Sequence, residues 1–231
     1  MHARPHLFSD ASCLSYGSLK KSLLFSSSFF SISCAEKRFL KVVFDRVLER
    51  LEKNFKVNSN KYYSAYLQGK NETDTYFSPY HSGQWTIFLY YMSYELGHFD
   101  GGEKRKTILL ADKVYYLNKI MNSCDLYHQV ELPDHFRLDH PQGSVMGRAK
   151  YGNGFSFSQC CTVGNNNGIY PQIGENCKMC MNSAILGKCK IGDNVILGAG
   201  AIVKDQDIPS NSIVFGHSPN LIIKQRNKLQ V

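Results

Sequence analysis

Hydrophobic residues recur every three or four positions in three segments between residues 37 and 130. This spacing predicts three helices, each with one apolar stripe that packs into a core. The predicted stripes are Leu40, Phe44, Val47, Leu48, Leu51 and Phe55 in the first helix, Trp85, Phe88, Leu89, Met92 and Leu96 in the second, and Ile108, Leu109, Val114, Leu117, Ile120 and Met121 in the third. The polar residues 59–79 are expected to connect the first two helices, and Gly101-Gly102 to form the turn before the third.

Beyond residue 140 the hydrophobic period changes to six. The residues that stand six apart are Ile173, Met179, Ile185, Ile191, Leu197 and Val203, and small or medium residues follow four positions after the first five of them, at Cys177, Ser183, Cys189, Val195 and Ala201. An earlier block, Val145, Tyr151, Phe157 and Val163, has the same spacing. The two blocks are offset by ten residues, so residues 165–172 are predicted to form a loop that interrupts the repeat.

A period of six fits neither an α-helix nor a single strand, and it is typical of hexapeptide-repeat parallel β-helices. In such a fold the apolar residue and its small partner fill the interior, and Gly or Asn takes the corners, where other residues would be strained. About three and a half coils are expected over residues 145–208, at about 18 residues a coil. A β-rich domain with coincidental spacing is the alternative.

These patterns predict an α+β protein in three parts. Residues 1–36 are Ser-rich and are expected to be a disordered extension or a leader ahead of the true start. Residues 37–130 form a helical domain, and residues 131–231 form the β-helix domain with a C-terminal tail.

Composition narrows the possible classes. The 231 residues are 43% hydrophobic and 20% charged, which is ordinary globular usage and excludes collagen-like, coiled-coil and wholly disordered chains. No run of 18 uncharged apolar residues occurs, so no membrane span is expected. The net charge is +8, but residues 1–60 carry most of it, and the nearly neutral remainder argues against a nucleic-acid-binding protein.

Eight cysteines could indicate disulfides or zinc. The chain is longer than a disulfide-stapled domain, and the Cys177–Cys180 pair lacks the second ligand pair of a structural zinc site. The repeat places Cys177 and Cys189 in the interior and turns Cys180 outward or into a corner. We therefore expect reduced thiols, no metal and a cytoplasmic protein.

Several motifs around the repeat carry a family resemblance. They are Leu132-Pro133-Asp134, Leu138-Asp139-His140-Pro141, Gly143-Ser144-Val145-Met146-Gly147-Arg148, Cys161-Thr162-Val163-Gly164, Ile208-Pro209, Val214-Phe215-Gly216 and Ser218-Pro219. With them the chain resembles serine O-acetyltransferases over roughly residues 80–225, and more narrowly the serine-acetyltransferase-like proteins of surface-polysaccharide gene clusters. The resemblance implies a left-handed β-helix, acetyl-CoA as donor, and a homotrimer or a dimer of trimers.

Transfer of an acetyl group from a thioester to a hydroxyl needs a base, and neutral His suits that role. His140 matches the catalytic His of the family. A carboxylate that holds the other ring nitrogen would strengthen the base. Glu131 matches the family's dyad carboxylate best, Asp139 matches a substrate-contacting one, and Asp134 is a further candidate.

Alternatives to this chemistry remain open at the level of sequence. His140 could be a histidine without catalytic duty, and Cys160 or Cys161 could act as a nucleophile. No His occurs between residues 141 and 216, which counts against the carbonic-anhydrase branch of the fold, whose zinc needs His ligands.

The acceptor and donor sites are predicted from the same resemblance. Asp134, Asn167 and Tyr170 are the candidate acceptor-binding residues. In serine acetyltransferases the protruding loop carries an Arg-His pair, whereas no cation is present in the loop here. The donor is expected to lie along the later coils, at Gly198, Ala199, Gly200, Ala201, Lys204, Gly216, Ser218 and Lys224. Both lysines could equally be solvated surface charges.

The sequence thus favours an acetyl-CoA-dependent O-acetyltransferase that acts on L-serine or a related small acceptor. A sugar of surface-polysaccharide synthesis is an alternative acceptor, since polar loop side chains can hydrogen-bond a neutral sugar. A catalytically silent scaffold subunit is a second alternative.

Overall fold

The computed structural model describes residues 32–57, 77–101 and 103–226. The chain forms two compact units, the first ending at Leu117 and the second beginning at Asn118. Most of the predicted N-terminal extension and of the connection at 59–79 lies outside the described residues. The boundaries proposed for the domains, 37–130 and 131–231, remain predictions.

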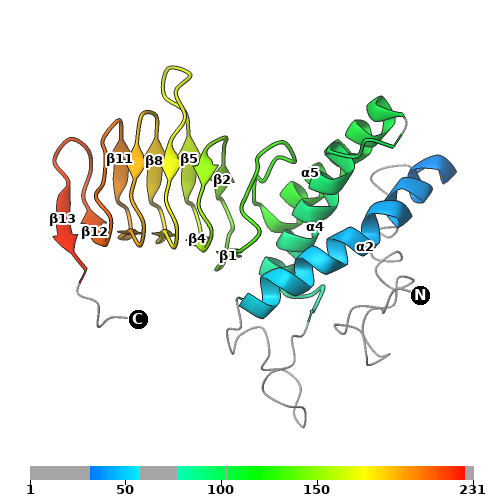
Figure 1. Cartoon of the computed structure of the whole chain (residues 1–231), viewed down its shortest axis with the longest axis horizontal. Helices are drawn as coiled ribbons and strands as arrows, with labels where there is room; N and C mark the ends of the chain where they lie inside the picture. Colours follow the sequence, from blue (N-terminus) through cyan, green and yellow to red (C-terminus); the bar gives the residue numbers. More distant parts are fainter. Residues whose placement is uncertain (1–31, 58–76, 102, 227–231) are drawn as a thin grey trace, which may run out of the picture. The chain divides into compact units, whose positions relative to one another are not determined.

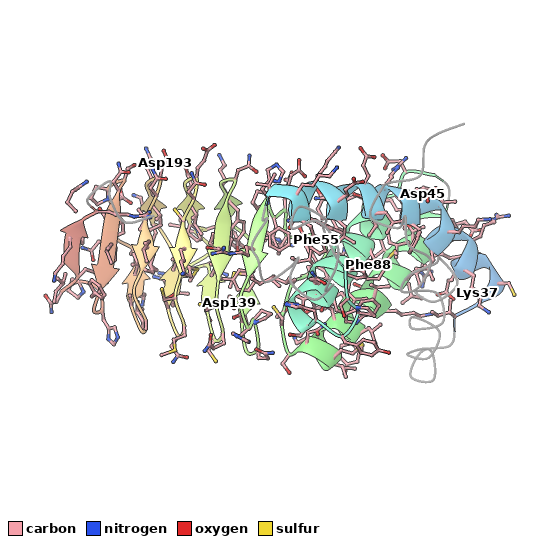
Figure 2. All side chains as sticks on the ribbon, turned by 90° about the horizontal axis from the view of Figure 1, so that it is seen from below. Lys37, Asp45, Phe55, Phe88, Asp139 and Asp193 are labelled. Atoms are coloured by element: carbon pink, nitrogen blue, oxygen red, sulfur yellow. The ribbon has the colours of Figure 1, made fainter. Side chains whose placement is uncertain are left out.

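The first unit contains the helices α2 (Cys34–Val57), α4 (Ser82–Gly97) and most of α5 (Lys104–Asn122) (Figure 1). The stripes predicted for the first two helices are buried, which confirms both. Phe88 is fully buried and packs against Phe44, Phe77 and Trp85, with ring centroids 5.0–6.4 Å apart. Figure 2 labels Phe88 and Phe55 in this aromatic core.

The stripe predicted for α5 is confirmed at Val114 and Leu117, which are buried, and wrong at three other positions. Leu109, Ile120 and Met121 are exposed, and the buried face is Thr107, Leu110, Ala111, Val114, Leu117 and Asn118. The helix carries hydrophobic residues on two adjacent faces, so the period cannot tell which of them is buried. The buried face tolerates polar residues because they are hydrogen-bonded: Thr107 Oγ1 donates to the Lys104 carbonyl at 3.0 Å, and Asn118 accepts from Asn122 at 2.8 Å.

The second unit is a three-sided parallel β-helix, and its sheets are called faces 1, 2 and 3. Face 1 contains β1 (Phe136–Leu138), β4 (Phe155–Phe157), β7 (Lys178–Met179), β10 (Ile196–Leu197), β12 (Ser212–Phe215) and β13 (Ile222–Gln225); face 2 contains β2 (Val145–Met146), β5 (Thr162–Gly164), β8 (Ala184–Leu186) and β11 (Ile202–Lys204); face 3 contains β3 (Lys150–Tyr151), β6 (Gln172–Ile173) and β9 (Lys190–Ile191). All pairings are parallel except that of β13 with β12.

Residues of the six-residue repeat stack in the interior, as predicted. Met179 pairs with Leu197 on face 1, Ile185 with Val203 on face 2 and Ile173 with Ile191 on face 3. The interior residues from Ile173 to Val203 and their small partners are all buried. Successive coils are joined by hydrogen bonds between residues 17 or 18 apart, such as Lys188 to Asp205 and Glu175 to Asp193.

The register predicted for the first coil is wrong at Val145. Val145 is 42% exposed, and the interior residue is Met146, which is 1% exposed and pairs with Val163. The corner after β2 is one residue shorter than the repeat, so counting back by six from Tyr151 reaches the wrong side chain. A slip of one residue on a strand turns the side chain to the opposite face. Tyr151 itself is half-buried, and its hydroxyl donates to the Gly147 carbonyl at 2.6 Å.

The corners use the left-handed backbone conformation, as expected. Between faces 3 and 1 it is taken by a column of asparagines, Asn176, Asn194 and Asn211, with φ of 53°, 56° and 58°. Asn194 donates its side-chain amide to Asn211 at 3.1 Å. The corners therefore form straight edges along the β-helix, and these edges position the candidate site.

Candidate active site

His140 lies on the edge between faces 1 and 2, in the first coil, between β1 and β2. Its backbone has a φ of 50°, and the turn is held by bonds from Gln142 N to the His140 carbonyl (2.9 Å) and from Asp139 N to the Phe157 carbonyl (3.0 Å). The side chains of His140 and Asp139 are each 65% exposed. An ordered turn therefore presents an imidazole to the surface.

Among the described residues, Asp139 is the carboxylate that the structure pairs with this imidazole. Its Oδ1 lies 3.7 Å from His140 Nε2. That distance is too long for a hydrogen bond, but it places a negative charge where a protonated ring would be stabilised. Figure 2 shows Asp139 on one side of the β-helix and Asp193, which belongs to the edge between faces 3 and 1, on another.

The other predicted carboxylates are exposed. Among the described residues, Glu131 forms no hydrogen bond or ion pair with His140, and Asp134 is exposed two residues before β1. Asp125 was missed by the sequence analysis. It is half-buried, and its backbone forms a parallel bridge with Val145 of β2. Its Oδ2 lies 2.6 Å from Lys119 Nζ. No spacing marks Asp125 because it precedes the first complete coil.

The edge that carries His140 continues through every later coil. Backbone bonds connect Cys160 N to the Gln142 carbonyl (2.9 Å), Asn182 N to the Gln159 carbonyl (3.0 Å) and Gly200 N to the Met181 carbonyl (2.9 Å). His217 continues the ladder, with its Nε2 3.1 Å from the Gly200 carbonyl. The structure therefore places His140 and the predicted donor-binding residues Gly198, Ala199, Gly200 and Gly216 along one edge.

The donor candidates differ in what they can offer a ligand. Gly200 has a φ of 72°, and a Cβ built there meets nothing within 4 Å, so its α-carbon faces open space while its N–H and carbonyl are engaged by Met181 and His217. Ala199 is exposed, and Gly216 is exposed with a φ of 81°. Gly198 is buried against the Phe215 ring, and Ala201 is fully buried in the interior slot, so the Ala201 methyl group is not available.

The remaining donor candidates lie at the end of the β-helix. Lys204 is exposed, and its backbone N–H donates to Ser218 Oγ at 3.0 Å; Ser218 Oγ in turn donates to Gln206 at 2.9 Å. Lys224 Nζ lies 6.0 Å from the centroid of the Phe215 ring. Lys204 ends β11 at the far side of face 2, next to Asp205 and the hairpin edge, whereas Lys224 belongs to β13 on face 1.

The predicted loop protrudes from a different edge, the one between faces 2 and 3 (Figure 1). It is a tight hairpin in which Asn166 and Ile169 exchange backbone hydrogen bonds of 3.1 and 3.0 Å. Asn167 and Gly168 form its tip, with φ of 50° and 77°. Asn167 and Tyr170 are both exposed. Within one chain, the hairpin and His140 therefore lie at opposite sides of face 2.

Asp205 fixes the base of this hairpin. Its Oδ2 accepts from the Asn166 amide at 2.5 Å, and its Oδ1 accepts from the Lys188 backbone N–H at 2.8 Å. The bond from Lys188, and then that from Asn166, lower the pKa of the Asp205 carboxyl. The stability that these bonds give is present above the ordinary pKa of an Asp and is lost as the pH falls through the lowered value.

We expect Asp205→Asn to lower the melting temperature at neutral pH, because an amide cannot accept both bonds. The difference from the wild type should shrink on acidification, as the wild-type carboxyl is protonated. Thermal melts followed by circular dichroism from pH 7 downward measure it. A difference that does not change with pH would contradict the assigned role of the carboxylate.

The cysteines lie as the repeat predicts. Cys177 is buried, and burial raises the pKa of its thiol to about 11, whereas Cys180 is half-buried at a corner. Cys161 is fully buried, with Sγ 3.1 Å from the Cys180 carbonyl, which does not suit a nucleophile, while Cys160 is exposed. The described part of the chain contains no group of three or more His, Cys, Asp or Glu side chains arranged to hold a metal.

Comparison with known proteins places the repeat in a family. Residues 160–205 match the family model "bacterial transferase hexapeptide (six repeats)". A serine acetyltransferase of Staphylococcus epidermidis is 27% identical over 141 residues, which are 54% of this chain and 60% of the relative. This chain is a hexapeptide-repeat protein that resembles serine acetyltransferases. It spans about 60% of the length of that relative.

Solved structures confirm the fold of the hexapeptide-repeat protein. The serine acetyltransferase of Brucella abortus aligns with a TM-score of 0.61 and 18% identity over 83% of this chain and 74% of its own. That of Neisseria gonorrhoeae in complex with serine aligns with a TM-score of 0.58 and 26% identity over 78% and 70%. The predicted fold class, helices followed by a left-handed β-helix, is confirmed. Within the described residues, no helix has the length and apolar character to span a membrane.

Proposed function

We propose that this protein transfers an acetyl group from acetyl-CoA directly to a hydroxyl group, with His140 as the general base. The observation that carries the proposal is that His140 and the open Gly200 backbone share one edge of the β-helix. Solved relatives support the donor and an acceptor: one serine acetyltransferase structure is a complex with CoA and another a complex with serine. L-serine is thus the first acceptor to test.

The chemistry follows from the exposed imidazole. The thioester supplies an activated acetyl group. A neutral His140 accepts the proton of the acceptor hydroxyl as its oxygen attacks the acetyl carbonyl, and the resulting imidazolium is stabilised by the Asp139 carboxylate. His140 then returns the proton to the departing CoA thiolate, so the ring ends the cycle neutral. No covalent enzyme intermediate is needed.

The edge between faces 1 and 2 suits the donor chemically. Gly200 offers an α-carbon that a long ligand can approach closely, since nothing lies within 4 Å of the position that a Cβ would take, while the His217 ring lies beside its carbonyl. Lys224 supplies a cation toward the end of the β-helix, where the phosphates of the donor would need one, whereas Lys204 lies at the opposite edge of face 2, next to Asp205. Ala201 contributes only its backbone, because its side chain is buried.

The acceptor site needs a second copy of the chain, because the hairpin and His140 lie on different edges. In a cyclic trimer the contacts are heterologous, so one edge of face 2 meets the opposite edge of the next copy. Face 2 suits such a contact. Its first outward column, Val145, Thr162, Ala184 and Ile202, carries no charge, whereas face 3 presents Lys150, Gln172 and Lys190 in the corresponding column. In the second outward column, Gly164, Leu186 and Lys204, only Lys204 in the last strand is charged. We include this trimer in the proposal.

Ala184→Arg is expected to convert the trimer into monomers and to abolish acetyl transfer. The substitution puts an unpaired charge at the centre of face 2, where the contact would bury it. Analytical ultracentrifugation measures the change. Gln172→Arg, on the exposed column of face 3, is the matched control and should stay trimeric. A trimer that survives Ala184→Arg would show that face 2 is not the interface.

A sugar hydroxyl is a second candidate acceptor, and the uncharged hairpin favours it. Asn167 and Tyr170 offer amide and phenol groups that hydrogen-bond neutral hydroxyls. Incubation with acetyl-CoA and either L-serine or a nucleotide sugar, followed by detection of free CoA thiol, separates the two. If neither class of acceptor causes thiol release, the proposed function is refuted.

A further inference from the structure

Arg148 occupies the corner between β2 and β3, directly below the hairpin. Two backbone bonds fix this position: Gly147 N donates to the Val163 carbonyl at 2.8 Å, and Lys150 N donates to the Pro171 carbonyl at 3.1 Å. Val163 lies two residues before the hairpin leaves the coil, and Pro171 is where it returns. A Cβ at Gly147 would lie 2.6 Å from the Val163 carbonyl, so the chain at this corner runs close against the coil above.

Among the described residues, the Arg148 guanidinium has no acidic partner. It is exposed, and the structure shows it in no hydrogen bond or ion pair with any described residue. The hairpin above it, residues 165–171, carries no charged side chain. The acids of this edge, Asp205 and Asp207, belong to the last coil and accept backbone N–H groups of Lys188 and Lys190 at 2.8 Å. The corner therefore offers an unneutralised cation.

The position of Arg148 relative to His140 indicates where this cation could act. Both residues belong to the first coil and flank β2, His140 on the edge with face 1 and Arg148 on the edge with face 3. In the proposed trimer these two edges meet between neighbouring copies, and residues of the same coil lie at the same height. The guanidinium of one copy then faces the imidazole of the next across the acceptor site.

We propose that Arg148 binds an anionic group of the acceptor, a carboxylate or a phosphate, while the acceptor hydroxyl faces His140 of the adjacent copy. The inference rests on the proposed function and names its substrate class. A guanidinium presents a planar fork of donors that matches either anion bidentately, and charge-assisted bonds of this kind are strong. An amino acid and a nucleotide sugar both qualify, whereas an uncharged sugar does not. The cation that the hairpin lacks is thus supplied by the coil below it.

Four acceptors test the proposal: L-serine against L-serinamide, which lacks the carboxylate, and uridine diphosphate glucose against methyl glucoside, which lacks the phosphates. The wild type should have a higher kcat/KM for the anionic member of the pair that it uses. Arg148→Ala should lower that value by about 10- to 100-fold, mainly through KM, and leave the neutral member unchanged. Arg148→Lys should recover part of the loss. Lys188→Ala, two coils further along the same edge, is the matched control and should behave as the wild type.

Equal use of both members of a pair by the wild type, or an equal loss for both in Arg148→Ala, would overturn the assignment and leave the proposed function standing. If the wild type transfers acetyl to none of the four acceptors, the proposed function itself is refuted. Mixing His140→Ala with Arg148→Ala subunits tests the shared site. After random exchange of equal amounts, about a quarter of all interfaces carry both native residues, so activity on the anionic acceptor should return to that level. No recovery after verified subunit exchange would overturn the placement of the two residues across copies.

Discussion

His140→Ala is expected to lower kcat/KM for acetyl transfer by about 100- to 10,000-fold, because the acceptor hydroxyl would lose the group that takes its proton. The folded state should be unaffected, since the side chain is largely exposed and forms no hydrogen bond within the described chain. Thiol release from acetyl-CoA in the presence of acceptor measures the activity, and circular dichroism checks the fold.

Gln142→Ala is the control for this experiment, because Gln142 is exposed on the same turn and supports the edge through its backbone carbonyl. Undiminished transfer by His140→Ala would show that the base is another group. A wild type that neither binds nor consumes acetyl-CoA would instead favour a catalytically silent scaffold subunit.

Ile191→Ala is expected to destabilise the β-helix by about 2–5 kcal/mol, because it removes a side chain that is 3% exposed and stacks on Ile173 between coils. Lys190→Ala removes the exposed side chain next to it on the same strand and should cost less than about 0.5 kcal/mol. Urea unfolding measures both. Equal losses would show that the interior residue is not packed as the register indicates.

The β-helix could be predicted from the sequence because its period is strict. From Ile173 to Val203 every sixth residue enters the interior, and no other regular structure has that spacing. The prediction fails where the chain departs from the period: the short corner after Met146 turns Val145 outward. The third helix shows the same limit, because Leu109 and Leu110 both fit a helical stripe and only the packing of the unit decides which is buried.

The candidate site was harder to predict than the fold. His140 stood out by its motif, and the structure places it at an edge with Asp139 beside it. Glu131 was chosen from its sequence position, yet among the described residues it forms no hydrogen bond or ion pair with the ring. Arg148 was part of a family motif but had no assigned role, because its place below the hairpin depends on which coils stack. The sequence shows spacing along the chain, whereas the site depends on neighbours 17 to 22 residues apart.

The straight edge between faces 1 and 2 sets a fixed length. From the His140 turn to Gly200 the ladder takes three steps, through Cys160 and Asn182, and adjacent strands lie about 4.8 Å apart, so the span is roughly 14 Å. In the proposed mechanism, this span sets the length that the donor needs, because the arm that carries the acetyl group must reach from Gly200 to His140. Inserting one whole coil would leave every local contact intact and still place the thioester one strand spacing short of the imidazole.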